Sequence, residues 1–144
     1  PASTGVFCFW VHVAMIYSLL VLSSPVSGQG AQTAATFAQA VLAAGHTIRR
    51  VFFFDAGCYA GADLAVFPQD ETDRLGPWVE LAEQQQVELV LCISSAIRRG
   101  QLDATEASRH EKACASVHPA FTLSGLGELV DATAHSDRLV TFGG

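Results

Sequence analysis

The chain has 144 residues, of which 50% are hydrophobic and only 15% are charged. This composition predicts one packed globular domain and excludes an intrinsically disordered chain. Eight basic residues stand against 14 acidic ones, which gives a net charge of −6. Because a non-specific nucleic-acid binder needs a basic face to displace counterions, direct nucleic-acid binding is not expected.

Four cysteines, Cys8, Cys58, Cys92 and Cys114, are widely spaced along the chain. An even number is compatible with disulfides, but the spacing lacks the density of a small secreted disulfide scaffold. No two cysteines have Cys-x-x-Cys spacing and no Cys/His cluster has metal-ligand spacing, so no metal site is expected. Reduced thiols in a cytoplasmic protein are the favoured interpretation.

Residues 6–22 form an apolar run that resembles a signal peptide or a membrane span. Against both, no Lys or Arg precedes Arg49, so the positive n-region of a signal peptide is missing, and the run is short for a span. We favour a third interpretation, in which residues 1–14 are a non-native or upstream extension. Residues 15–144 then form a single domain that begins at Met15 and has no membrane segment.

From Met15 onward, apolar strands are expected to alternate with helices. The predicted strands are Ile16–Leu22, Ile48–Phe54, Glu88–Cys92, Phe121–Leu123 and Arg138–Phe142. Runs such as Val51–Phe54 lack the polar alternation of a half-exposed strand, which indicates strands covered on both faces.

The predicted helices are Gln32–Ala44, Glu71–Gln86, Ala104–Cys114 and Gly125–Ala134, with Gly45 as the C-terminal cap of the first. Strand–helix alternation predicts an α/β fold, a three-layer α/β/α sandwich around a mostly parallel five-stranded sheet. Gly-rich loops follow the first two strands. Since neither carries a dinucleotide-binding or P-loop motif, turn glycines are favoured over a nucleotide site.

Cys92 ends the third predicted strand, at the carboxyl edge where open parallel sheets bind their ligands. If a helical turn follows, its free N–H groups point toward the sulfur, and Arg98 and Arg99 add positive potential. Both effects stabilise a thiolate, which is the form that attacks a sulfur donor. Position alone fits a small apolar residue at the end of a buried strand equally well.

The residues around Cys92 are more specific. The segment Cys-Ile-Ser-Ser-Ala-Ile-Arg-Arg-Gly at 92–100, followed by Leu102-Asp103 and Glu106-Ala107, resembles part of the DsrE/TusD sulfur-relay family, where alanines are more usual at positions 94 and 95. Segments 37–40, 45–46 and 50–53 resemble the family's first helix and second strand, and 121–127 and 137–140 resemble its C-terminal signature. Together these cover nearly all of residues 15–142 in the family's order.

The resemblance implies a DsrE-like fold and a cytoplasmic sulfurtransferase subunit with no metal or organic cofactor. Cys92 is the implied catalytic thiol, which accepts sulfane sulfur as a persulfide and passes it to a partner thiol. TusD-like proteins work with TusC-like and TusB-like subunits in a heterohexamer. They receive sulfur from a TusA-like donor and pass it through a TusE-like acceptor toward 2-thiolation of the tRNA wobble uridine. DsrE relatives carry sulfur in sulfur oxidation, and the sequence leaves the two pathways open.

Other polar residues have weaker assignments. Cys58 lies in the loop after the second strand and is a candidate second thiol that resolves a persulfide as a disulfide, although a structural loop cysteine is favoured. Arg98 and Arg99 are predicted either to favour the thiolate and dock an acidic partner, which we prefer, or to solvate a loop. Asp103 and Glu106 are expected to cap the next helix. No site pattern includes Cys8, Cys114, His46, His110, His118 or His135.

Two other functions compete with the relay enzyme. A non-catalytic scaffold subunit of a hetero-oligomer would need no reactive thiol, and its activity would depend on its assembly surfaces. A flavodoxin-like binder of a small ligand would need a phosphate-binding loop, and the sequence contains none.

Overall fold

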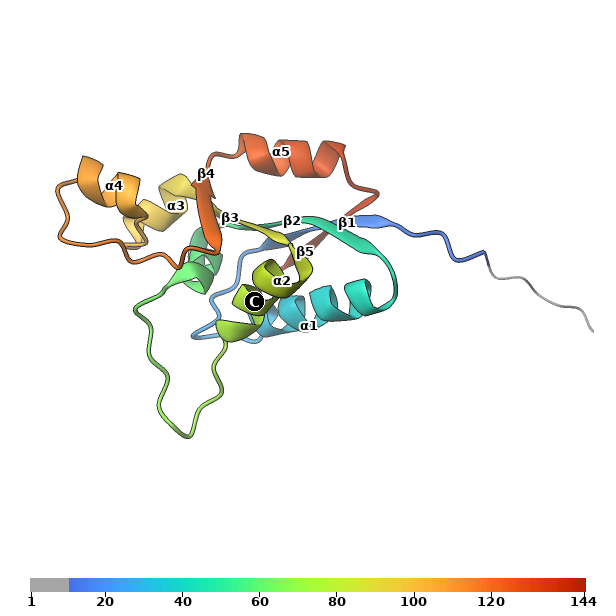
Figure 1. Cartoon of the computed structure of the whole chain (residues 1–144), viewed down its shortest axis with the longest axis horizontal. Coiled ribbons are helices and arrows are strands. Elements are labelled where there is room, and N and C mark those ends of the chain that lie inside the picture. The colour runs from blue at the N-terminus through green and yellow to red at the C-terminus, as the bar shows by residue number, and fades with distance from the viewer. Residues whose placement is uncertain (1–10) are drawn as a thin grey trace, which may run out of the picture.

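A five-stranded, all-parallel sheet lies at the centre of the computed structural model, which describes residues 11–144 (Figure 1). The strands are β1 Ile16–Val21, β2 Thr47–Phe53, β3 Glu88–Cys92, β4 Phe121–Ser124 and β5 Arg138–Phe142. They lie in the order β4-β3-β2-β1-β5 and each neighbouring pair is parallel. All five predicted strands are confirmed, β3 and β5 at both ends.

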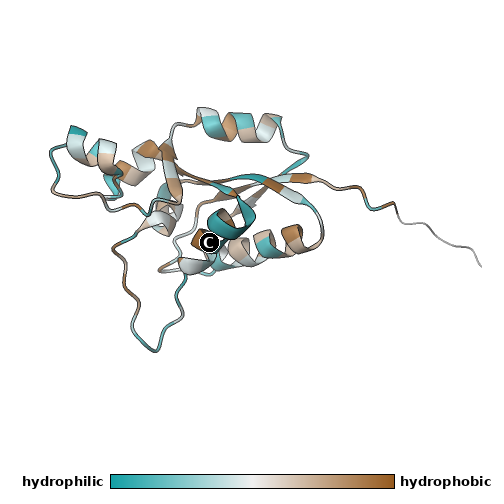
Figure 2. Ribbon diagram, in the orientation of Figure 1, coloured by the Kyte–Doolittle hydropathy of each residue, from teal (hydrophilic) through white to brown (hydrophobic). Residues whose placement is uncertain are grey.

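Helices cover both faces of the sheet. The helical segments are α1 Gly30–Ala43, η1 Asp55–Gly61, α2 Gly76–Gln85, α3 Ile93–Arg98, α4 Ala104–Arg109 and α5 Gly127–Ala134. Figure 1 shows α1 and α2 on one face and α5 on the other, with α3 and α4 together at one end of the sheet. The predicted three-layer α/β/α arrangement is therefore confirmed. Hydrophilic and hydrophobic residues occur side by side on α1 and α5 (Figure 2), as expected for helices that bury one face.

The apolar run near the start of the sequence enters the sheet. Its residues 16–21 form β1, which pairs with β2 on one side and β5 on the other. Residues 1–10, and with them Cys8 and most of the predicted extension, lie outside the described residues, while residues 11–15 have no regular secondary structure. Among the residues described, no helix is long and apolar enough to cross a membrane.

Helix α2 begins later than predicted, at Gly76 instead of Glu71. The Asp73 carboxylate accepts hydrogen bonds from the backbone N–H groups of Leu75 (2.9 Å) and Gly76 (3.1 Å). This turn satisfies free N–H groups at the start of the helix, and Pro77 then occupies the first helical turn, where it costs no hydrogen bond.

Helix α4 ends earlier than predicted, at Arg109 instead of Cys114. Glu111 takes a left-handed backbone conformation with φ of 54°, and the Lys112 N–H group bonds back to the Ala107 carbonyl (2.8 Å). Such a left-handed residue with a backward bond terminates a helix.

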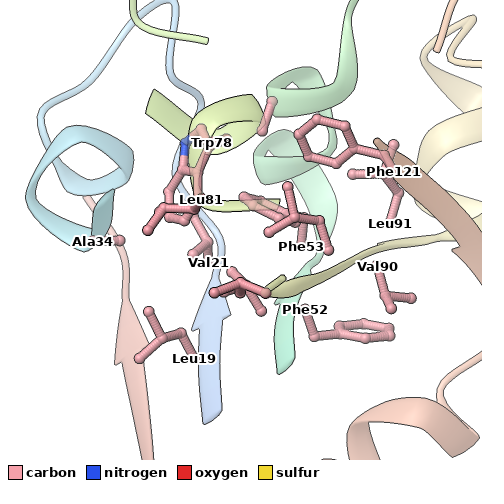
Figure 3. Packing of buried hydrophobic residues seen from close by; sticks show 14 of the residues in the cluster. Leu19, Val21, Ala34, Phe52, Phe53, Trp78, Leu81, Val90, Leu91 and Phe121 are labelled. Carbon is pink, nitrogen blue, oxygen red and sulfur yellow. The ribbon is translucent and has the colours of Figure 1, made fainter. Parts of the chain in front are cut away.

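Buried aromatic side chains form part of the hydrophobic core on both faces of β2. Phe52 and Phe53 have no exposed surface, and Figure 3 shows them on opposite sides of β2, as the pleat of a strand requires. Phe53 meets the fully buried Trp78 edge to face, with ring centroids 4.9 Å apart. Each such side chain stabilises the fold by about 1.5–3 kcal/mol.

Arg50 of β2 connects α5 to the sheet through ion pairs near the amino end of β3. Its side chain is only 8% exposed and forms ion pairs with Glu88 (2.8 Å), Glu128 (2.8 Å) and Asp131 (3.0 Å). This cluster lies at the opposite end of β3 from Cys92, so it supports the fold and leaves the carboxyl edge to other residues.

Candidate functional site

Cys92 lies where the sequence predicted, at the carboxyl end of β3 and as the N-cap residue of α3. Because β3 is flanked by β2 and β4, the residue stands between the ends of two neighbouring strands, and it pairs with Ser124 of β4. The helical turn expected after it is present as α3. Cys92 is 1% exposed and its thiol is free.

Two serines of α3 surround the sulfur. Ser94 Oγ lies 3.4 Å from Cys92 Sγ. Ser95 Oγ accepts a hydrogen bond from the Asp55 N–H group (3.1 Å), which leaves its own hydroxyl hydrogen free for the sulfur. Burial alone raises the pKa of the Cys92 thiol, but hydrogen bonds from the hydroxyl and N–H groups of Ser94 and Ser95 outweigh it and hold the pKa below its usual value.

These serines occupy the two positions at which alanines are more usual in the resembling family segment. The sequence showed the departure but did not identify the serines as donors to the sulfur. That role depends on the helical turn at the start of α3. The turn brings the hydroxyls of Ser94 and Ser95, two and three residues after Cys92, back to its thiol. A hydroxyl residue two positions after a strand-ending cysteine is the signal that could have revealed it.

The two arginines have different surroundings. Arg99 forms an ion pair with Asp55 of η1 and donates a hydrogen bond to the Ser95 carbonyl (3.1 Å), so it braces η1 against α3. Asp55 holds a left-handed φ of 52°, a conformation that is costly outside glycine and that these contacts maintain. Arg98 is exposed on α3. Their predicted support of the thiolate and docking of a partner remain predictions.

Cys58 lies against Cys92, since both occupy the carboxyl edge. Its thiol has no exposed surface and donates toward two carbonyl oxygens, that of Phe53 (3.4 Å) and that of Cys92 (3.8 Å). Burial, with a further contribution from Cys92, raises the pKa of the Cys58 thiol to about 12. Cys58 is therefore protonated at neutral pH and a weak nucleophile. Its role as a second thiol remains a prediction.

The other predicted residues lie away from the thiol or serve the fold. Asp103 caps α4 as predicted, because its carboxylate accepts from the Glu106 N–H group (2.8 Å). Glu106 is buried and pairs with Arg109 (2.6 Å) and His110 (3.3 Å). Cys114 is exposed. Within residues 11–144, no three His, Cys, Asp or Glu side chains gather as a metal site would require.

The serine hydroxyls can be tested by the pH dependence of Cys92 alkylation. Because the pKa of Cys92 is lowered, the wild-type thiol is expected to stay reactive as pH falls below the usual thiol range. In Ser94→Ala the alkylation profile shifts to higher pH, and the rate at neutral pH falls about ten-fold, since a hydrogen bond to a charged group contributes about 1.5–3 kcal/mol. The measurement is the iodoacetamide rate at Cys92 against pH.

Ser94→Ala is the cleanest variant because Ser94 is exposed, whereas Ser95→Ala also removes the acceptor of the Asp55 N–H group. Ser108→Ala, at an exposed serine of α4, is the matched control and is expected to keep the wild-type profile. Identical profiles for wild type and the Ser94→Ala/Ser95→Ala double variant would show that the hydroxyls do not stabilise the thiolate.

The sequence and the fold can be compared with those of known proteins. A model of the DsrE/DsrF-like family matches residues 15–142. The sulfurtransferase TusD of Serratia proteamaculans is 43% identical over 129 residues, which cover 89% of this chain and 100% of that protein. The sulfurtransferase TusD of Yersinia pestis is 42% identical, with coverage of 90% and 98%. DsrE of Allochromatium vinosum, a sulfurtransferase by its name, is 43% identical, with coverage of 90% and 99%.

The fold has a counterpart among solved structures. The crystal structure of the ychN protein from E. coli superposes with a TM-score of 0.67 at 19% sequence identity, covering 90% of this chain and 100% of that one. The predicted family and fold are thus confirmed, and the relatives carry the name of the predicted enzyme class, sulfurtransferase. The chain belongs to the DsrE/DsrF-like family.

Proposed function

We propose that this sulfurtransferase accepts sulfane sulfur as a persulfide on Cys92 and transfers it to a thiol of a partner protein. The observation that carries the proposal is the Cys92 thiol at the carboxyl edge of the sheet, where hydrogen bonds from Ser94 and Ser95 lower its pKa. The thiolate is the form that attacks sulfur, and a lowered pKa increases its share, so this environment suits the reaction.

The chemistry consists of two exchanges. In the first, the Cys92 thiolate attacks the outer sulfur of a donor persulfide; a new S–S bond forms on Cys92, and the donor leaves as a thiolate. In the second, a partner thiolate attacks the outer sulfur on Cys92, and Cys92 leaves as a thiolate. A lowered pKa of Cys92 favours this departure. Electrons balance in both exchanges, so neither needs a metal or an organic cofactor.

The proposal extends to the pathway. We place the chain in a cytoplasmic relay for 2-thiolation of the tRNA wobble uridine, with a TusA-like donor and a TusE-like acceptor. TusB-like and TusC-like subunits would complete a heterohexamer. The support is the 42–43% identity to proteins named TusD over nearly their whole length.

A second pathway and the bounds of the domain are also part of this proposal. DsrE of Allochromatium vinosum is as similar as TusD, which supports sulfur carriage in sulfur oxidation as the second candidate. We also propose residues 15–144 as the family's domain, because the family match begins at residue 15.

Intact-protein mass spectrometry with peptide mapping tests the proposed function. After incubation with a cysteine desulfurase, cysteine and a TusA-like carrier, the peptide that contains Cys92 is expected to gain one sulfur atom, removable by reductant. The exposed Cys114 is the internal control and is expected to gain none. No sulfur on Cys92, either in the isolated chain or in a complex co-expressed with TusB-like and TusC-like subunits, would contradict the proposal.

A further inference from the structure

A groove of about 440 Å³ lies at the end of α3 opposite Cys92. It is lined by Ile97, Arg98, Gly100, Leu102, His110 and Lys112. Leu102 is 8% exposed and Ile97 is half-buried, so the groove has an apolar floor, whereas Arg98 and Lys112 are exposed beside it. An apolar floor with a few charged groups around it is typical of a recognition site.

The segment from residue 98 to residue 112, which lines this groove, carries four Lys and Arg residues against three carboxylates, Asp103, Glu106 and Glu111, in an otherwise acidic chain. Four of the eight Lys and Arg residues lie between positions 98 and 112. Two of them are neutralised, since Arg99 pairs with Asp55 and Arg109 with Glu106. The other two, Arg98 and Lys112, pair with no carboxylate in the part of the chain that the structure describes. The groove therefore presents two cations that are free to bind an external anion.

The groove and the thiol lie along one helix. Ser94 and Arg98 are four residues apart and both exposed, so they share a face of α3, and Ser94 Oγ is 3.4 Å from Cys92 Sγ. Helix α3 has six residues, which correspond to a length of about 9 Å at about 1.5 Å per residue. An extended chain covers that distance with about three residues. A bound segment can thus touch the groove and place a thiol near Cys92.

We propose that this groove docks an acidic segment of the protein that exchanges sulfur with Cys92. Carboxylates of the segment bind Arg98 and Lys112, an apolar side chain covers Ile97 and Leu102, and the reacting thiol follows about three residues along the extended segment. The inference rests on the proposed function, because it concerns the partner of the Cys92 thiol. Two free cations above an apolar floor suit a carboxylate-bearing peptide better than a nucleic acid, whose binding needs many phosphate contacts.

Titration of the ¹⁵N-labelled protein, followed by NMR, tests the groove. The probes are the acetylated peptide Asp-Leu-Glu-Gly-Gly-Ser, with serine in the place of the reacting cysteine, and its matched amide Asn-Leu-Gln-Gly-Gly-Ser. The acidic peptide is expected to shift the amide signals of Gly100, Leu102 and Lys112 with a Kd on the order of 1 mM. The amide peptide is expected to bind about five-fold more weakly, since two partly exposed charge pairs are lost.

Variants provide the matched control. Arg98→Ala/Lys112→Ala is expected to weaken the acidic peptide about five-fold and to abolish its preference over the amide peptide. Arg138→Ala removes an exposed arginine from the edge strand β5 and is expected to change neither.

Equal binding of the two peptides, an absence of shifts at the groove, or an unchanged affinity of the double variant would overturn the inference. Displacement of the acidic peptide by an equal concentration of an RNA oligonucleotide would overturn it too, in favour of a nucleic-acid site. Sulfur loading of Cys92 is measured separately. Loading without peptide selectivity contradicts the groove alone, and peptide selectivity without loading contradicts the proposed function alone.

Discussion

Cys92→Ser is expected to abolish sulfur acceptance while the protein keeps its fold. A serine hydroxyl has nearly the shape of the thiol and can accept the hydrogen bonds from Ser94 and Ser95, so the loss of stability is about 1 kcal/mol. It ionises far above neutral pH and forms no persulfide, so the loss of sulfur transfer is complete. Mass spectrometry after sulfur loading measures the loss of sulfur acceptance, and thermal unfolding measures the change in stability.

The same variant separates the relay enzyme from the scaffold subunit. In a co-expressed complex that is given a TusA-like donor and a TusE-like acceptor, the relay enzyme stops transferring sulfur when Cys92 is replaced. A scaffold would continue, and only changes to its assembly surfaces would stop it. Cys114→Ser is the matched control, since Cys114 is exposed and is expected to be dispensable in both cases. Continued transfer by the Cys92→Ser complex would therefore refute catalysis by this thiol.

The strands could be predicted closely because their signal is local. In Glu88–Cys92 an apolar run follows Glu88, and the small polar residues Ser94 and Ser95 come soon after Cys92; the strand has the predicted bounds. The ends of α2 and α4 could not be predicted as well. They depend on the Asp73 side chain and on the left-handed backbone of Glu111, neither of which changes the apolar periodicity.

The site was only partly predictable for a related reason. The position of Cys92 follows from strand order and the edge rule for parallel sheets. The proximity of Cys58 follows from the same rule. The ion pair between Arg99 and Asp55, in contrast, joins residues 44 positions apart. It decides that Arg99 braces η1 while Arg98 stays free, and no sequence pattern distinguishes two adjacent arginines in this way.

η1 contains Asp55 and Cys58, two residues that lie near Cys92. We expect Gly57→Ala, in the middle of η1, to be strongly destabilising. A Cβ atom at Gly57 would lie 3.0 Å from the Val21 carbonyl carbon and closer still to its oxygen. That oxygen also accepts the Phe54 N–H group (3.0 Å), so the backbone of β1 cannot yield without losing this bond. The expected cost is about 3 kcal/mol, or a fall in Tm of roughly 10 °C.

Displacement of η1 in Gly57→Ala can be followed by the alkylation of Cys58. η1 holds Cys58 buried against Cys92, so in Gly57→Ala the Cys58 thiol is expected to become open to alkylation, whereas in the wild type it is protected. Gly125→Ala is the control, because a Cβ atom there meets nothing within 4 Å and both stability and Cys58 protection are expected to persist. If Gly57→Ala kept the wild-type Tm and a protected Cys58, then η1 would not be pressed against β1.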